Sequence, residues 1–432
     1  MSSRLNYGKT FLLGFGFFGV SVVWGVYNAF VPIFLSEKFN VAPALIGFFM
    51  TLDNIAALFI QPPVGAWSDR IRTPLGRRIP FIIIGAPITA LAFGLIPVAS
   101  IVPLFVACTS TTLLSAALWR TPVVALMPDI TPSAFRSQAN GIINFMGGLG
   151  SIIALQTGGL LYKMSPDFPF WMGSVLVVLA ALVVYLFIEE PKEYEQAEQQ
   201  PGLLASLREV FADKEKSGLR LLLAIFFWFV GYSAIETFFT LYAKNRLGLE
   251  PGDGATLLSV LPLFFVLCAI PAGYLGSRIG RRVTITIGLV IMIFMLIMIY
   301  ITPVDALLTG IAPLPLVGIP LVEGGARMLT LAGVLLIFGG IGWAFVNINS
   351  LPMVVDLTGA ARIGTFTGLY YLFSTLSAIA GPNLNGWAVQ LADNNYNVIM
   401  IISPVFMAIA LWLMLGVRRG EAQVEGQNQA YP

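Results

Sequence analysis

Residues 65–78 read GAWSDRIRTPLGRR, and residues 273–282 read GYLGSRIGRR. Both stretches place glycines around an arginine-rich turn, and both follow a long apolar run. They are separated by 208 positions, so that Arg70 pairs with Arg278 and the glycines at 65 and 273 coincide. Two copies of one loop predict that this chain of 432 residues contains two halves of similar fold.

The pairing continues on either side of these loops. Pro43 pairs with Pro251 at the same offset, and beyond residues 302–327 an offset of 227 pairs Asp129 with Asp356. Parallel repeats related by an axis along the membrane normal occur in transporters, whose halves rock about a site between them. The repeat therefore favours a transporter built from two halves.

The composition is that of a membrane protein. Apolar residues make up 57% of the chain and charged residues 11%, whereas soluble domains carry about 25% charged residues. A water-soluble protein of this length cannot bury so much apolar surface, but a bilayer accepts it because lipid is the solvent for the outer face. We therefore expect an integral membrane protein with the lipid bilayer as a partner.

Twelve apolar runs are long enough to span a bilayer, for which about 20 mostly apolar residues are needed. They lie at residues 10–35, 44–67, 79–99, 102–127, 137–161, 170–188, 219–243, 254–276, 283–302, 328–355, 363–390 and 396–416. The first run is too long for the core of a signal peptide. The predicted fold class is an all-α integral membrane protein with twelve transmembrane helices in two pseudo-symmetric six-helix halves.

The domain organisation follows from these runs. We predict an N-terminal half at residues 1–188, a C-terminal half at 218–417 and a disordered cytoplasmic tail at 418–432. Residues 189–217 are rich in Glu, Gln and Lys and predict a cytoplasmic linker with a short surface helix at 203–211. Residues 302–327 are apolar but broken by prolines and glycines, which predicts an external excursion.

The basic residues predict the orientation, because cytoplasmic loops carry an excess of Lys and Arg. With both termini inside, 18 of the 24 Lys and Arg fall on the inner side and 5 on the outer side, and Arg120 lies within a span. We therefore expect a multi-pass protein of the cell inner (plasma) membrane with both termini in the cytoplasm.

Several classes of function are disfavoured. The net charge of +2 indicates no nucleic-acid partner, and Cys108 and Cys268 lie in apolar runs without metal-ligand spacing. Histidine is absent, so that proton chemistry requires carboxylates. No Gly-x-Ser-x-Gly turn or nucleotide-binding loop occurs, so we expect neither an enzyme nor a bound cofactor. A non-transporting membrane receptor would need a larger cytoplasmic domain than residues 189–217.

The two loops resemble the signature loops of the major facilitator superfamily. The first loop has a longer form and is followed by Ile79-Pro80-Phe81-Ile82, and residues 122–129 end in Ala-Leu-Met-Pro-Asp. Both features resemble the sucrose/proton symporters of plants and their bacterial and animal relatives, within the wider group of glycoside–cation symporters. The resemblance implies the major facilitator fold and alternating access, with a proton as the coupling ion and a sugar or glycoside as the solute.

The resemblance also implies a cytoplasmic gate. Asp69 would cap a neighbouring helix N-terminus, where a carboxylate is favourable, and would pair with basic loop residues to hold this side closed. The alternative is that the arginines only set the topology. The candidate gate residues are Asp69, Arg70, Arg77, Arg78, Asp129, Arg136, Arg278, Arg281, Asp356 and Arg362. One departure from the plant members is Val124 in place of their helix-four arginine, with Arg120 one turn deeper instead.

Asp53, Arg120 and Glu236 lie well inside predicted spans. Each costs about 2.5–3.5 kcal/mol at the centre of a spanning helix, so such residues are functional candidates. Our hypothesis is that Asp53 carries the proton and that Arg120 favours its ionised form in one state. From the rise per residue of a helix, Asp53 and Arg120 differ in membrane depth by about 10 Å. The long side chain of an arginine can span part of this distance. A permanent structural ion pair is the alternative.

The repeat pairs Glu236 with Asn28 and Arg120 with Asn347, on helices that line the cavity in the superfamily. Glu236 is thus a substrate ligand or an alternative proton site. The candidate substrate-binding residues are Trp24, Tyr27, Asn28, Arg120, Glu236, Trp343, Asn347, Asn349 and Tyr371. The alternatives are interhelical hydrogen bonds for the asparagines and interfacial anchoring for the aromatic residues.

The predicted function is proton-coupled symport of a sugar or glycoside, the small-molecule partner, by a monomer. Sodium coupling stays open because carboxylate and asparagine oxygens also suit that ion. Another alternative is an exporter of small amphipathic compounds, whose promiscuous apolar cavity would tolerate mutation of Asn28 or Asn347.

Overall fold

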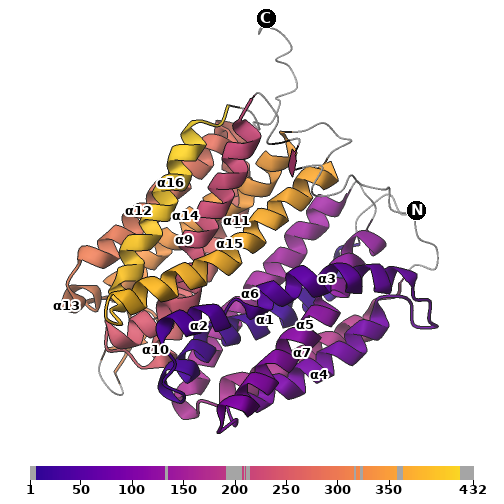
Figure 1. The fold of residues 1–432 in the computed structure, drawn as a ribbon, viewed down its shortest axis with the longest axis horizontal. Coiled ribbons are helices and arrows are strands. Elements are labelled where there is room, and N and C mark those ends of the chain that lie inside the picture. Colours follow the sequence, from indigo (N-terminus) through magenta and orange to yellow (C-terminus); the bar gives the residue numbers. More distant parts are fainter. Residues whose placement is uncertain are drawn as a thin grey trace, which may run out of the picture.

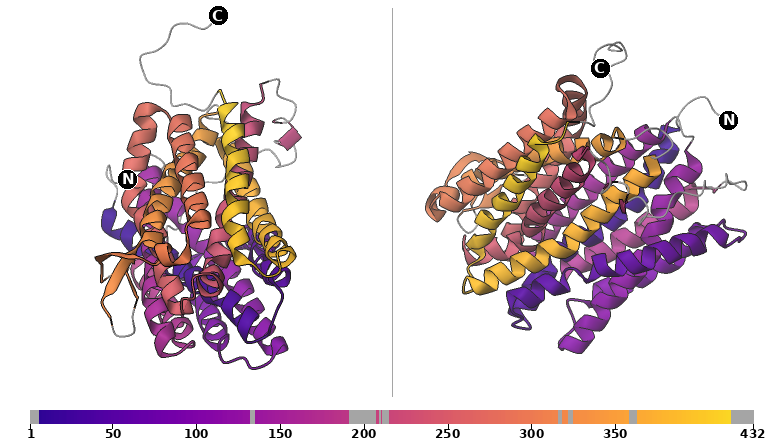
Figure 2. Two further views of the ribbon diagram at one scale, coloured as in Figure 1. Left: turned by 90° about the vertical axis from the view of Figure 1, so that its left-hand side faces the viewer. Right: turned by 45° about the horizontal axis from the view of Figure 1, so that its top comes forward.

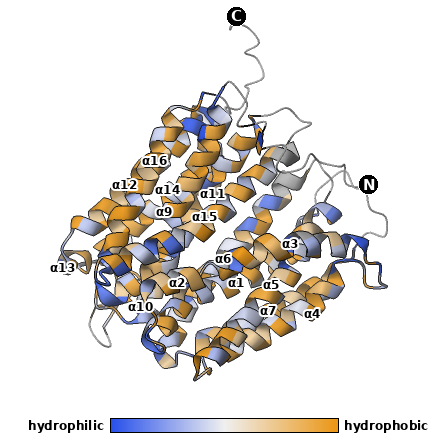
Figure 3. Cartoon of the chain, in the orientation of Figure 1, coloured by the Kyte–Doolittle hydropathy of each residue, from blue (hydrophilic) through white to orange (hydrophobic). Residues whose placement is uncertain are grey.

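The computed structural model describes residues 6–131, 135–190, 207–208, 210, 215–315, 318–321, 325–357 and 363–418. Two groups of long helices lie side by side, one from each half of the chain (Figure 1). Hydrophobic residues cover the lengths of the helices and hydrophilic residues gather mainly at their ends (Figure 3). This distribution is the one expected of helices that cross a bilayer.

The N-terminal group contains seven helical segments among the described residues. They are α1 (Tyr7–Glu37), α2 (Pro43–Phe49), α3 (Leu52–Arg70), α4 (Ile79–Leu95), α5 (Val102–Ile130), α6 (Arg136–Met164) and α7 (Phe168–Phe187). The C-terminal group contains α9 (Ser217–Asn245), α10 (Pro251–Leu258), α11 (Val260–Ile279), α12 (Arg281–Ile301), α14 (Leu331–Val355), α15 (Ile363–Leu391), the 3-10 turn η3 (Tyr396–Val398) and α16 (Ile399–Leu415).

These segments account for the twelve predicted spans. In the described part of the chain, ten helical segments are long and apolar enough to cross a membrane. The other two predicted spans are α4, which is a shorter apolar helix of 17 residues, and α15, which is helical over 29 residues. The prediction of an all-helical membrane protein with this helix count is confirmed.

The second helix of each half is broken at the same repeat position. α2 ends before Thr51, whose hydroxyl donates to the carbonyl oxygen of Phe48 at 2.7 Å. α10 ends before Ser259, whose hydroxyl donates to the carbonyl oxygen of Thr256 at 2.6 Å. Hydroxyl side chains that bind nearby backbone carbonyls compete with regular helix geometry. The spans predicted at 44–67 and 254–276 are thus both present, and each contains one such break.

The predicted excursion at 302–327 contains secondary structure that the sequence did not indicate. It comprises the short helix α13 (Val304–Leu307) and the strands β1 (Gly310–Pro313), β2 (Ile319–Pro320) and β3 (Arg327–Thr330). The strands form an antiparallel sheet in the order β1-β3-β2 and project beside the helices (Figure 2). The helix of the span predicted at 328–355 begins at Leu331, because residues 327–330 form β3, which pairs with β1 and β2.

Thr330 marks the start of α14. Its side-chain oxygen accepts a hydrogen bond from the backbone N–H of Gly333 at 3.2 Å, which caps the helix. Most of the predicted linker at 189–217, with its surface helix at 203–211, lies outside the described residues, as does nearly all of the tail at 418–432. The side chain of Arg136 and all of Arg362 also lie outside them.

The two halves are joined at the end where α1 and α9 finish. Lys163 at the end of α6 pairs with Asp253 of α10 at 2.6 Å, and Lys244 of α9 pairs with Glu37 of α1. α2 also packs along α15, and α6 packs along α10. α1 and α9 therefore run in the same direction and end on the same face of the molecule.

The start of α1 and the end of α16 lie on the opposite face. At the start of α9, the guanidinium of Arg220 donates to the carbonyl oxygen of Gly416 at 2.6 Å, so α16 ends where α9 begins. α1 begins on this face too, since Lys9 donates to the carbonyl oxygen of Glu189 after α7 at 3.1 Å. This shared face agrees with an even number of spans.

Glycines let the halves approach closely at the joined end. A Cβ atom at Gly47 of α2 would overlap the backbone carbonyl of Pro382 in α15, and one at Gly386 of α15 would lie 2.5 Å from the carbonyl oxygen of Pro43. The two glycines thus make reciprocal backbone contacts between the second helix of the first half and the fifth helix of the second half.

Candidate functional site

The three intramembrane charges come together between the halves. The side-chain amide of Asn28 in α1 donates to Glu236 Oε1 in α9 at 3.3 Å. Asp53 in α3 interacts electrostatically with both Glu236 and Arg120. Four residues separated by up to 208 positions in the chain therefore form one polar cluster, which we call the central cluster (Asn28, Asp53, Arg120 and Glu236).

Asp53 owes its place to the break before α3. The break puts this carboxylate in the first turn of α3, where the helix dipole favours negative charge. Its Oδ1 accepts a hydrogen bond from the side-chain amide of Asn54 at 2.8 Å. Within the described residues no ion pair under 4.0 Å joins Asp53 to Arg120, so the two charges interact across a gap.

Arg120 connects the central cluster to the second half. It lies half-buried in α5 and interacts electrostatically with Asp53 and with Tyr371 of α15. Tyr371 is 57% exposed although it lies within a helix of the C-terminal group. The predicted arginine and tyrosine thus face one another across the boundary between the halves.

Glu236 reaches solvent-accessible space at the same boundary. It is exposed, whereas its neighbours Ile235 and Thr237 are buried. Because it bonds to Asn28 of the opposite half, its exposed face opens between α1 and α9 rather than outwards. An ionisable residue inside a membrane protein is expected to face such a water-filled opening or a partner.

Aromatic side chains line this region on both sides. Trp24 and Tyr27 of α1 meet edge to face at a centroid distance of 5.7 Å, and Tyr232 of α9 stacks on Trp343 of α14 at 3.8 Å. Among the described residues, Trp24 Nε1 and Tyr27 Oη are buried without a hydrogen-bond partner. Buried polar groups left unpaired are costly, so these two atoms are unusual for the interior of a protein.

Tyr232 was missed by the sequence reasoning. It precedes Glu236 by one helical turn and interacts electrostatically with it. The spacing of four residues was a usable signal, because residues i and i+4 share a helix face. Asn54 was also missed, although it adjoins Asp53 in the sequence.

The two predicted asparagine ligands of α14 are placed differently. Asn347 is half-buried and lies one turn beyond Trp343, on the aromatic side of the helix. Asn349 is 3% exposed, and its amide donates to the carbonyl oxygens of Ala272 at 3.1 Å and Phe345 at 3.0 Å. The structure therefore engages Asn349 in packing between α11 and α14 and does not bring it to the central cluster.

The predicted gate residues of the first half form an ion-pair network. Arg77 pairs with Asp129 Oδ1 at 2.7 Å, Arg78 pairs with Asp129 Oδ2 at 3.1 Å, and Arg78 also pairs with Asp69. Both arginines are buried, while Asp69 is half-exposed. The network ties the loop before α4 to the end of α5.

Glu190, which was not predicted, caps α4. Its carboxylate accepts hydrogen bonds from the backbone N–H groups of Arg77, Arg78 and Ile79 at 2.8, 2.6 and 2.7 Å. In the described structure the helix N-terminus beside the loop is thus capped by Glu190 rather than by Asp69. Gly76 has a φ of +104°, and a Cβ atom there would lie 2.5 Å from this carboxyl group.

The second half repeats part of this arrangement. Arg281 pairs with Asp356, the repeat partner of Asp129. Arg278 lies over the ring of Tyr274 at 4.6 Å, and Arg70 in the first half is exposed. The ion pairs described for the predicted gate residues lie within one half, so in this conformation they brace each half separately.

Comparison with known proteins agrees with this architecture. Residues 13–382 match the sequence profile of the Major Facilitator Superfamily. The chain belongs to this superfamily. It therefore has the major facilitator fold of a multi-pass membrane protein.

Individual relatives in the superfamily are distant. Multidrug resistance protein 1 of Bacillus subtilis is 24% identical over 243 residues, and the cis,cis-muconate transport protein of Acinetobacter baylyi is 24% identical over 171 residues. These alignments cover 56% and 38% of this chain, and 59% and 41% of the relatives. The nucleoside transporter NupG superposes with a TM-score of 0.68 at 16% identity, covering 96% of this chain and 99% of NupG. The structural likeness shows the fold.

Proposed function

We propose that this chain is a proton-coupled symporter of a sugar or glycoside that works by alternating access. The observation that carries the proposal is the central cluster, where a carboxylate from each half meets an arginine and an asparagine. Ionisable side chains are energetically unfavourable in lipid, so within spanning helices they usually contact water, a transported solute or one another. The cluster meets that condition at the boundary about which the halves rock.

Asp53 is the proposed proton carrier. Asp53 interacts electrostatically with Arg120 but forms no direct ion pair with it. A small movement of one half relative to the other therefore changes the electrostatic potential at Asp53. When Arg120 is near, the ionised form is favoured, and when Arg120 moves away, desolvation favours the protonated form. Alternation between these arrangements couples proton uptake and release to the rocking motion. A sodium ion bound by Asp53 and nearby amide oxygens is the alternative coupling ion.

The polar and aromatic lining supports a hydroxyl-rich solute. Asn28 and Glu236 offer a donor and acceptors, while Trp24 Nε1 and Tyr27 Oη are buried without partners among the described residues. The stacked pair of Tyr232 and Trp343 supplies a flat apolar face beside them. Sugar rings combine hydroxyls with apolar faces, which suits this lining.

A second candidate is export of small amphipathic compounds. It is favoured by the relatives named as multidrug resistance proteins of Bacillus subtilis. The two candidates differ in how much they need Asn28 and Asn347. Replacement of both by alanine is expected to abolish sugar transport but to leave export of apolar compounds largely intact, as measured with a panel of both classes of solute.

Transport into proteoliposomes under an imposed pH gradient tests the coupling. A panel of sugars and glycosides is screened first by thermal shift, since a bound ligand stabilises the folded protein. Asp53→Asn is expected to abolish accumulation against a gradient while leaving exchange of solute across the membrane. The matched control is Asp167→Asn, because Asp167 lies at the start of α7 away from the central cluster.

Three results would contradict the coupling proposal. Asp53→Asn that still accumulates solute would reject Asp53 as the carrier. Accumulation driven by a sodium gradient and indifferent to pH would replace the proton by sodium. Outward pumping of amphipathic compounds, with no response to any sugar, would favour the second candidate.

A further inference from the structure

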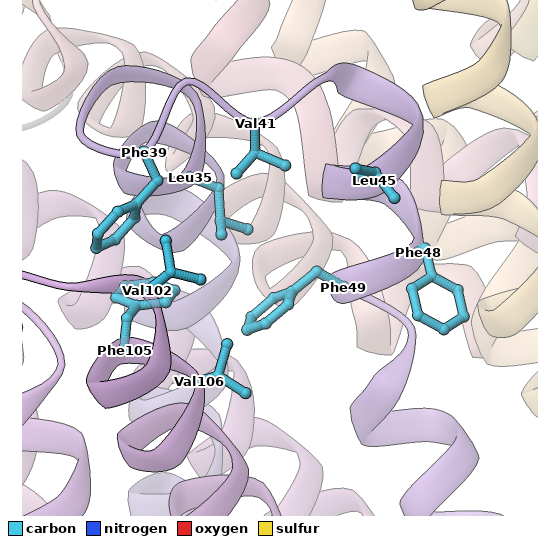
Figure 4. Close-up of a pocket in the computed structure, with 9 residues that line it drawn as sticks. All are labelled: Leu35, Phe39, Val41, Leu45, Phe48, Phe49, Val102, Phe105 and Val106. Carbon is cyan, nitrogen blue, oxygen red and sulfur yellow. The ribbon is translucent and has the colours of Figure 1, made fainter.

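A cavity of about 200 Å³ lies at the joined end of the N-terminal half, and no residue of the central cluster lines it. It is bounded by the end of α1, by α2 and by the start of α5 (Figure 4). Each of the nine side chains that line it is apolar. Such a lining offers no group to orient a polar solute, so the cavity is not a part of the proposed transport site.

The cavity is closed by packed aromatic rings on one side and has exposed side chains on the other. The ring of Phe105 packs against Phe39 at 4.9 Å and against Phe49 at 5.9 Å, which forms an aromatic floor. Leu45 and Phe48 on α2 are 61% and 51% exposed. Since these helices span the membrane, exposed apolar side chains on them face acyl chains. The cavity is therefore a groove open to the lipid.

A lysine stands at the rim of this groove. Lys38 lies between Leu35 and Phe39, which both line the cavity, and its ammonium is 5.9 Å from the centroid of the Phe39 ring. The ammonium donates to the carbonyl oxygen of Pro97 at 2.8 Å. In the described part of the chain it forms no ion pair within 4.0 Å. An ammonium has three donors, so its charge and two donors remain for an anion.

We propose that this groove binds one acyl chain of an anionic phospholipid whose phosphate contacts Lys38. The lysine follows the last turn of the first spanning helix, which is the depth at which lipid headgroups lie. The apolar groove suits the acyl chain of such a lipid, and the ammonium of Lys38 suits its phosphate. The bound chain would fill the space between α2 and α5 at the end where the halves are joined.

Native mass spectrometry of protein purified from defined vesicles tests the proposal. One set of vesicles contains phosphatidylglycerol and the other phosphatidylcholine. The wild-type protein is expected to retain one phosphatidylglycerol more strongly than phosphatidylcholine. Val106→Trp, which fills the groove, is expected to lose this retained lipid, and Lys38→Gln is expected to lower the preference for phosphatidylglycerol at least threefold.

Matched controls separate the site from general lipid contact. Leu91→Trp adds the same ring at an exposed apolar position of α4, and Arg246→Gln removes a cation after α9. Both are expected to behave as the wild type. Leu45→Trp is a second groove variant, and thermal unfolding establishes that each variant is folded. Unchanged retention in both folded groove variants would overturn the proposal, as would equal retention of the two lipids by the wild type.

Discussion

At the scale of single residues, the polar groups of this protein divide into two kinds. Those of the central cluster meet across the boundary between the halves, as Asn28 and Glu236 do. Those of the loop before α4 bind within one half, as Glu190 and Asp129 do. In the proposed function, the first kind responds to the solute and to the rocking motion, whereas the contacts of the second kind brace one half.

Glu236 is expected to contribute to solute binding rather than to coupling. Glu236→Ala should raise the KM for solute about tenfold or more, because a hydrogen bond to a charged group contributes about 1.5–3 kcal/mol. Glu236→Gln should recover part of this loss, since the amide still reaches Asn28. Exchange measured in proteoliposomes gives the KM. If Glu236→Gln exchanges normally but no longer accumulates solute, Glu236 is the proton site.

Glu190 is expected to stabilise the first half. Glu190→Ala leaves the backbone N–H groups of Arg77, Arg78 and Ile79 without their carboxylate, which should cost about 1–3 kcal/mol. A lower midpoint of thermal unfolding is the expected result. Glu189→Ala removes the adjacent exposed carboxylate and serves as the control. Equal midpoints for the two variants would show that the cap contributes nothing.

At the scale of elements, the breaks and the close helix contacts follow the repeat. α2 and α10 are short segments that end at Thr51 and Ser259, 208 positions apart. Each packs on a helix of the opposite half, α2 on α15 and α10 on α6. The segments that join the two halves at one end are thus equivalent parts of the repeat.

A side chain at Gly47 is expected to disfavour the closure of this end. The Cβ of Gly47→Ala would overlap the backbone carbonyl of Pro382, which cannot rotate away. The population should therefore shift towards the conformation that is open here. Alkylation of a single cysteine at Asn383, with Cys108 and Cys268 replaced by serine, should become faster. Gly141→Ala is the control, because a Cβ there meets nothing within 4 Å; equal rates in both variants would refute the expectation.

At the scale of the whole molecule, the halves are joined at one end, and α1 begins and α16 ends at the other. The loop charges predict that the face where α1 begins is cytoplasmic. The conformation seen would then be closed towards the outside, with each gate network contained in its own half. In that reading, opening outwards requires the pair between Lys163 and Asp253 to separate.

The orientation has a direct test. A reporter that is active only in the cytoplasm, fused after residue 418, is expected to be active, and one inserted in the external sheet after Pro313 is expected to be silent. The reverse pattern would place the arginine-rich loops outside. It would leave the fold untouched but would invert the assignment of the closed end.

The sequence alone determined the class of the protein, its two halves and its intramembrane charges. These features depend on composition and on patterns within single helices, which need no knowledge of packing. It also indicated Asp53, Arg120 and Glu236 as one group, because charges in a membrane need partners. It did not predict the break at Thr51 or the strands at 310–330, since both depend on local hydrogen bonds that compete with an apolar helix pattern.

Only the tertiary structure decided which side chains meet. In the folded protein Asn28 donates to Glu236, Asn349 bonds between packed helices, and Glu190 caps α4. The tertiary structure also formed an apolar cavity near Lys38 that no sequence pattern marks. The reason is physical: a contact between helices depends on their relative rotation and depth, which are set by the packing of all side chains together and not by the pattern of any one segment.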